Sequence, residues 1–229
     1  LLVRYQSLLL VSHAHPHVVA LVHVWVLGFF VTAACGAAYQ IAPVALGTSL
    51  PNKRYGWWHL GLHTIGVLGM VVMLWRWDLA QVGHFGTLVA MGAGLFTVSI
   101  RRIVRTSQHR SLVTTSLNAA SRWLLLTVTL GLIIAANRFW GFIPLDPLPL
   151  LRAHAHAGIA GFFVTLLQGV TFQLIPMVTL AEVRSERMAA TGFWISQITL
   201  LTLIPSLILQ IGWFSFAVGI AFLGGCALT

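Results

Sequence analysis

Residues 154–180 read HAHAGIAGFFVTLLQGVTFQLIPMVTL and contain no Asp, Glu, Lys or Arg. A bilayer core about 30 Å thick is crossed by about 20 apolar residues in a helix, so this stretch is long enough to span a membrane. It therefore predicts a transmembrane helix with two histidines at its start.

The composition of the whole chain supports the same environment. Of the 229 residues, 58% are hydrophobic and 7% are charged. Soluble domains carry roughly 25% charged residues, so lipid rather than water must surround most of this chain. The formal charge of +9 is explained by basic loops facing anionic lipid headgroups. We expect no nucleic-acid partner.

Apolar runs of spanning length recur along the sequence. We expect an all-α, polytopic bundle of about six or seven transmembrane helices, which forms one domain over residues 1–229. The predicted spans are 17–46, 57–75, 80–100, 117–137, 154–180 and 189–211, and residues from Trp213 onward predict the start of a seventh. The chain begins without Met and ends within an uncharged run, so we expect it to be part of a longer protein.

The basic residues predict the orientation of the spans, because cytoplasmic loops collect Lys and Arg. Threading the spans back and forth places three basic loops on one face: Lys53 with Arg54, the loop of Arg101–Arg110, and Arg184 with Arg187. We therefore expect these loops in the cytoplasm and the protein in a bacterial-type inner membrane.

Two of the predicted spans, 17–46 and 154–180, share one sequence pattern. At an offset of 133 residues the matched positions are His23 with His156, Gly28–Thr32 with Gly161–Thr165, Gly36 with Gly169, Gln40 with Gln173, and Pro43 with Pro176. The threading gives both spans the same direction and puts both histidines near the periplasmic face. The pattern predicts an internal parallel repeat, with two similar helices in one bundle.

The stretch from His154 and His156 through Gly169 to Pro176 resembles the tenth helix of subunit I in haem-copper oxidases and nitric oxide reductases. The sequence GAAYQIAP at 36–43 resembles the end of their histidine-bearing second helix. The resemblance is to the haem-copper oxidase subunit I-like superfamily, which includes small haem-binding and NnrS-like members. It implies haem b, one group or two.

The same resemblance implies roles for three histidines. His154 is a candidate ligand of a high-spin haem and His156 of a low-spin haem, with His23 as the partner of His156 across the bundle. Residues i and i+2 of a helix point about 200° apart, so His154 and His156 do not easily share one metal. The resemblance thus implies His23 and His156 as the metal ligands of the low-spin iron.

Other features of that family are not found in this sequence. No His-His dipeptide occurs, and the tyrosines are Tyr5, Tyr39 and Tyr55, so copper is a candidate cofactor without a visible site. The predicted spans also contain no Asp or Glu. We therefore expect no proton pumping through a relay of carboxylates.

The remaining histidines have two interpretations each. His84 lies at the level of the repeat histidines and is a candidate to complete a haem or metal site, or else an interfacial histidine bonded to a backbone carbonyl. His13, His15 and His17 form an HxHxH run that either binds copper or zinc or is a polar loop at the membrane surface.

His59 and His63 are four residues apart and share a helix face, which we expect near the cytoplasmic end of span 57–75. Trp57 and Trp58 beside them favour an interfacial aromatic belt there. A second haem at this depth is the weaker interpretation.

The leading hypothesis is a haem b-binding membrane protein of respiratory electron transfer or of diatomic-gas chemistry, with O2 or NO as the gas. One alternative is a non-catalytic structural subunit of a larger membrane complex, and another is a metal-handling membrane protein. Other membrane subunits are candidate partners. Whether the chain is an oxidoreductase stays open.

Overall fold

The computed structural model describes residues 15–50, 52–108, 111–144, 146–180 and 185–229, and all regular structure in these ranges is helical. The first span is one continuous helix made of α2 (Pro16–His23), η1 (Val24–Val31) and α3 (Thr32–Ala45), and the fifth is made of α7 (Pro147–His156), η2 (Ala157–Val164) and α8 (Thr165–Thr179). The others are α4 (Lys53–Arg76), α5 (Leu79–Thr106), α6 (Leu112–Trp140), α9 (Glu186–Ile208) and α10 (Gly212–Ala227).

Six of these helices are long and apolar enough to cross a membrane, and α10 is a shorter apolar helix. The prediction of an all-α bundle with six or seven spans is confirmed. Large apolar side chains such as Leu68, Leu201 and Trp213 are exposed on its outside, as suits contact with lipid tails. The chain is a multi-pass helical membrane protein.

The helix ends explain where the predicted boundaries differ from the observed ones. The fifth span begins at Pro147 rather than near His154, because Asp146 caps the helix by accepting a hydrogen bond from the Leu148 amide and Pro147 suits the first helical turn. Likewise α4 begins at Lys53, where Asn52 is the cap. Charged residues such as Lys53 and Arg54 therefore belong to the first turn of a spanning helix, where the bilayer interface tolerates them.

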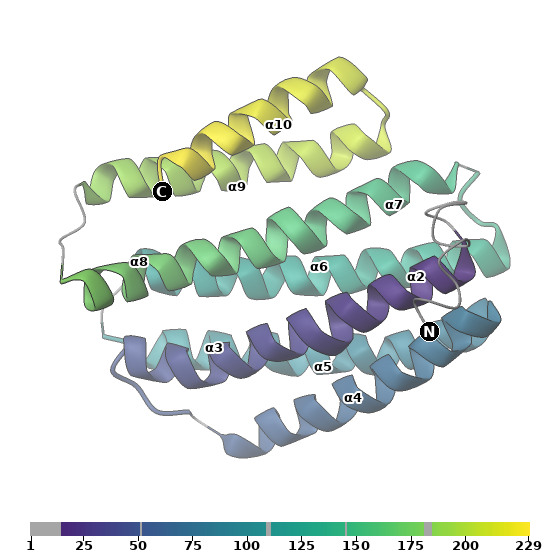
Figure 1. Cartoon of the computed structure of the whole chain (residues 1–229), viewed down its shortest axis with the longest axis horizontal. Coiled ribbons are helices and arrows are strands. Elements are labelled where there is room, and N and C mark those ends of the chain that lie inside the picture. The colour runs from purple at the N-terminus through teal and green to yellow at the C-terminus, as the bar shows by residue number, and fades with distance from the viewer. Residues whose placement is uncertain (1–14, 51, 109–110, 145, 181–184) are drawn as a thin grey trace.

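The spans lie side by side, with α4 at one edge, the α9–α10 pair at the other and α6 between them (Figure 1). The first span packs on α4 and α5, whereas the fifth packs on α6 and α9. The two spans run in the same direction on one side of the bundle (Figure 1).

The internal repeat extends further than the two histidine-bearing helices. The π-helical segments η1 and η2 are related by the same offset of 133 residues, as are the first residues of α4 and α9 and of α5 and α10. Trp77 and Gln210, also 133 apart, both have positive φ, of 58° and 56°, in the turns that follow α4 and α9. The chain thus contains two copies of a three-span unit, α2–α5 and α7–α10, joined by α6.

Candidate functional site

The structure brings two histidines together near one end of the bundle, His23 from the first span and His154 from the fifth. Their ring centroids are 6.3 Å apart and the ring planes differ by 18°. Both side chains are partly buried. They lie at the end of the spans opposite the Lys53 loop, which is the end predicted for the repeat histidines.

Hydrogen bonds determine the tautomer of both rings. His23 Nδ1 lies 2.8 Å from the Val19 carbonyl oxygen, and His154 Nδ1 lies 2.9 Å from the Thr127 carbonyl oxygen. A carbonyl can only accept, so each Nδ1 carries the proton. In a neutral imidazole this leaves the lone pair on Nε2, which is the arrangement typical of metal-ligating histidines.

Neighbouring helices hold the His154 ring in place. A Cβ added to Gly131 of α6 would lie 3.0 Å from His154 Cε1, so this glycine makes room for the imidazole. Thr127, one turn earlier on α6, supplies the carbonyl that binds Nδ1. Sequence reasoning missed both residues, because nothing in the sequence shows which face of α6 meets His154.

The other two candidates lie elsewhere. His156 is exposed, and its Nδ1 lies 2.8 Å from the carbonyl of Arg152 in its own helix. It lines a shallow hollow with Ala155, Ile159 and Ala160. His84 is exposed on α5. His154 and His156 point to opposite sides of their helix. The ring opposite His23 is therefore that of His154, and not that of His156, which is the residue equivalent to His23 in the repeat.

The π-helical segments were not predicted, and each begins directly after a repeat histidine, His23 or His156. A π-helix is rare and is frequently found at functional sites. Each segment ends at a threonine that is bonded by a neighbouring span. Thr32 Oγ1 lies 3.1 Å from His63 Nε2, and Thr165 Oγ1 accepts from Gln197 Nε2 at 2.9 Å.

His59 and His63 lie in the half of α4 that begins at Lys53, and their side chains point into the bundle. Both are buried, with 5% of their surface exposed, and His63 lies near the middle of α4. Trp57 and Trp58 do point outward, as expected of a belt at the interface. The two histidines therefore belong to the interior of the bundle.

Two histidines of the HxHxH run, His15 and His17, are described, and both make local contacts at the start of the first span. His15 caps α2 by accepting from the His17 amide, and the His17 ring stacks on Trp75 with centroids 3.9 Å apart. His13 lies outside the described residues, as do Arg110 and Arg184 of the basic loops.

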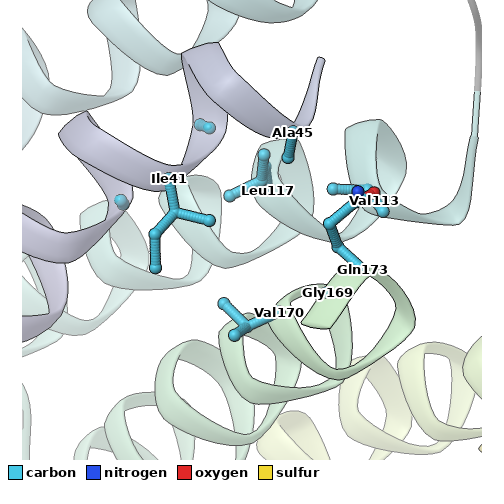
Figure 2. A pocket seen from close by; sticks show the side chains of 9 residues that line it. Ile41, Ala45, Val113, Leu117, Gly169, Val170 and Gln173 are labelled. Atoms are coloured by element: carbon cyan, nitrogen blue, oxygen red, sulfur yellow. The ribbon is translucent and has the colours of Figure 1, made fainter. Parts of the chain in front are cut away.

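An apolar fissure lies between the second halves of the first and fifth spans, about 22 Å along the helix from His23, because Ala38 follows that histidine by 15 residues. The equivalent residues Phe30 and Phe163 meet edge to face, with ring centroids 6.2 Å apart. Further along, Ile41 of α3 and Val170 of α8 face each other across the fissure, with Leu117 of α6 at its floor (Figure 2). The fissure is lined by Ala38, Ile41, Ala42, Ala45, Val113, Leu117, Gly169, Val170 and Gln173.

The chemistry of the site is that of paired imidazoles. Among the described residues, no three His, Cys, Asp or Glu side chains are grouped closely enough to hold a metal ion. Two nitrogen lone pairs on facing helices fit an ion that takes its other ligands from a bound cofactor. Comparison of the chain with known protein families, with curated proteins and with solved structures gives no match.

Proposed function

We propose that the chain is a haem b-binding membrane protein that carries electrons, with the imidazoles of His23 and His154 as the two axial ligands. One observation carries the proposal, the parallel pair of rings whose centroids are 6.3 Å apart. A ligating nitrogen lies about 2 Å from a metal and about 1 Å from its own ring centre, so rings on opposite sides of one ion have centres about 6 Å apart.

The surroundings of the pair support the same group. Both Nδ1 atoms donate to backbone carbonyls, so both Nε2 atoms are free to bind a metal.

Two imidazole ligands on one iron would favour one of the two activities implied by the resemblance to haem-copper oxidases. A haem iron with two imidazole ligands supplies reversible one-electron transfer. Binding of O2 or NO needs an open axial position, and His23 and His154 would leave none. We therefore favour electron transfer over diatomic-gas chemistry, within the haem-copper oxidase subunit I-like superfamily that the sequence resembles.

The test is an absorbance and electron paramagnetic resonance study of the full chain, purified in detergent after expression with haem supplied. We expect the bands of a low-spin b-type haem. His23→Ala and His154→Ala should each abolish the low-spin signal, whereas His156→Ala and His84→Ala, which change exposed histidines, should keep it.

Two results would contradict the proposal. Loss of the signal in His156→Ala with retention in His154→Ala would restore the pairing expected from the repeat. A purified chain without haem, folded by circular dichroism, would favour the structural-subunit alternative.

A further inference from the structure

A second pair of histidines, His59 and His63, lies inside the bundle and has no part in the proposed electron-transfer site. Both side chains are 5% exposed, and they stand one turn apart on α4 with ring centroids 5.6 Å apart and planes at 65°. Ionisable side chains within a membrane span are costly, and they mark functional positions by default. The pair therefore needs an explanation.

The tautomer of His63 follows from its hydrogen bonds. Its Nε2 lies 3.1 Å from the carbonyl oxygen of Leu27 and 3.1 Å from Thr32 Oγ1. Thr32 donates its own proton to Leu27, at 2.9 Å, so both oxygens can only accept from the imidazole. Nε2 carries the proton, and the lone pair of His63 is on Nδ1.

Two further potential metal ligands lie beside His63, the His59 ring and the Tyr39 hydroxyl, and neither is used in a hydrogen bond between described residues. None of the hydrogen bonds between described residues involves the His59 ring. The Tyr39 hydroxyl is buried near Ser99 but forms no hydrogen bond of normal geometry within the described chain. The Tyr39 and His59 ring centroids are 5.7 Å apart. Leaving a buried polar atom such as the Tyr39 hydroxyl oxygen unpaired costs about 1–3 kcal/mol, unless a ligand binds it.

The second copy of the three-span unit shows that packing alone does not require these side chains. At the offset of 133 residues, His59, His63 and Tyr39 correspond to Gly192, Ser196 and Phe172. All three potential ligands are lost in that copy. The residues that contact these histidines are kept, because Thr32 and Gly92 correspond to Thr165 and Gly225.

The glycine shared by the two copies also shows how the imidazole is accommodated. A Cβ on Gly92 would lie 3.2 Å from His59 Cδ2, and a Cβ on Gly225 would lie 3.0 Å from the Gly192 carbonyl oxygen. The same close approach of two helices thus holds a histidine in one copy and no side chain in the other.

We propose that His59, His63 and Tyr39 bind one divalent transition-metal ion of the copper and zinc class. Two imidazole nitrogens and a phenol oxygen suit such ions better than Mg²⁺ or Ca²⁺, which prefer oxygen ligands. An ion about 3 Å from each ring centre bridges rings up to about 6 Å apart, which accommodates the two histidines. The bond from His63 Nε2 to Leu27 orients the ligand as second-shell carbonyls do in other metal sites.

The experiment uses the full chain in detergent, stripped of metal with a chelator and then titrated with Co²⁺, whose visible d–d bands report ligand number. Zn²⁺ serves as competitor, and bound metal is counted by mass spectrometry. In the double variant His59→Ala with His63→Gln, glutamine can still donate to Thr32, as Gln197 donates to Thr165 in the second copy.

We expect the wild type to bind one more metal ion per chain than the double variant. Tyr39→Phe should weaken Co²⁺ binding by about tenfold or more and change its d–d spectrum, as loss of one ligand in a three-ligand site requires. His84→Ala, on the surface of α5, should behave as the wild type. Circular dichroism should show equal helicity in all variants.

Equal metal content in the wild type and the double variant would overturn the proposal. So would loss of a haem band in the double variant, since the pair would then be haem ligands. The outcome does not depend on the His23–His154 site: a chain without haem can still bind Co²⁺ here, and a haem-bearing chain can fail to.

Discussion

At the scale of single residues, a glycine of α6, Gly131, is as informative as the histidines themselves. Gly131 leaves the space that the His154 ring fills, because a Cβ atom added at this glycine would lie 3.0 Å from the ring. Gly94 of α5 has no neighbour within 4 Å of its own Cβ position. The two glycines are thus a matched pair for testing the site.

Gly131→Ala should lower haem occupancy or shift the low-spin spectrum, because the new methyl group would displace the His154 imidazole. The fold should not suffer, since alanine is favoured over glycine in a helix by about 1 kcal/mol. Absorbance of the purified variant per unit protein measures the effect. Gly94→Ala is the control, and an unchanged spectrum in Gly131→Ala would argue against His154 as a ligand.

At the scale of elements, each π-helical segment is held at its end by a polar side chain from a neighbouring span. In the second copy, Gln197 donates to Thr165 at 2.9 Å and accepts from Trp123 Nε1 at 2.9 Å. In the first copy Gln197 corresponds to Thr64, and the neighbouring His63 bonds Thr32 instead. The two bonds of Gln197 join three spans in the interior, where water cannot replace them.

Gln197→Leu should destabilise the protein by about 1–3 kcal/mol, because it leaves the buried Trp123 N–H and Thr165 hydroxyl without their partner. Unfolding in mixed micelles with increasing SDS, followed by circular dichroism, gives the difference. Gln40→Leu changes an exposed glutamine of α3 and should cost little. Equal stability of both variants would contradict the role of Gln197.

The two copies of the repeat contain equivalent glycines, Gly28 and Gly161, that differ in how closely a neighbouring helix packs on them. A Cβ on Gly161 would lie 2.7 Å from the Trp123 ring, whereas a Cβ on the equivalent Gly28 would lie 3.9 Å from Val67. Gly161→Ala should therefore cost about 1–3 kcal/mol through overpacking, and Gly28→Ala should be tolerated. Thermal unfolding of both variants in one detergent measures this. The reverse order would show that the two spans do not pack as described.

At the scale of the whole molecule, one end of the bundle carries more basic residues than the other, where Arg76, Arg138 and Arg152 lie. Lys53, Arg54, Arg101, Arg102 and Arg105 lie at the more basic end, where Arg102 also stacks its guanidinium on Tyr55 with 4.7 Å to the ring centroid. The His23–His154 pair is at the other end. Under the proposed function, an electron donor or acceptor would have to reach the pair at that other end.

A cysteine placed at Ser49 should react with a membrane-impermeant maleimide only after cells are opened, because basic loops stay in the cytoplasm. A cysteine at Arg138, near the opposite end of α6, should react in intact cells. Both tests need a background in which Cys35 and Cys226 are replaced. Labelling at Ser49 from outside intact cells would invert the topology.

Much of the fold was predictable, because hydrophobic length alone selects membrane-spanning helices. The repeat of 17–46 and 154–180 was visible through His23, Gly28–Thr32 and Pro43 and their partners. Its extension to α4–α5 and α9–α10 was not, since these helices share few residue types. The turns with positive φ at Trp77 and Gln210 carry that information in the backbone instead.

The sequence by itself determined the solvent, the number of the spans, and which histidines stand near the same end of the bundle. Those properties follow from composition, length and charge. Tertiary structure alone decided which ring faces which: His154 rather than His156 lies opposite His23, and His59 and His63 point into the bundle. The reason is that the rotation of a helix about its axis is set by packing, as Gly131 against His154 and Gly92 against His59 show.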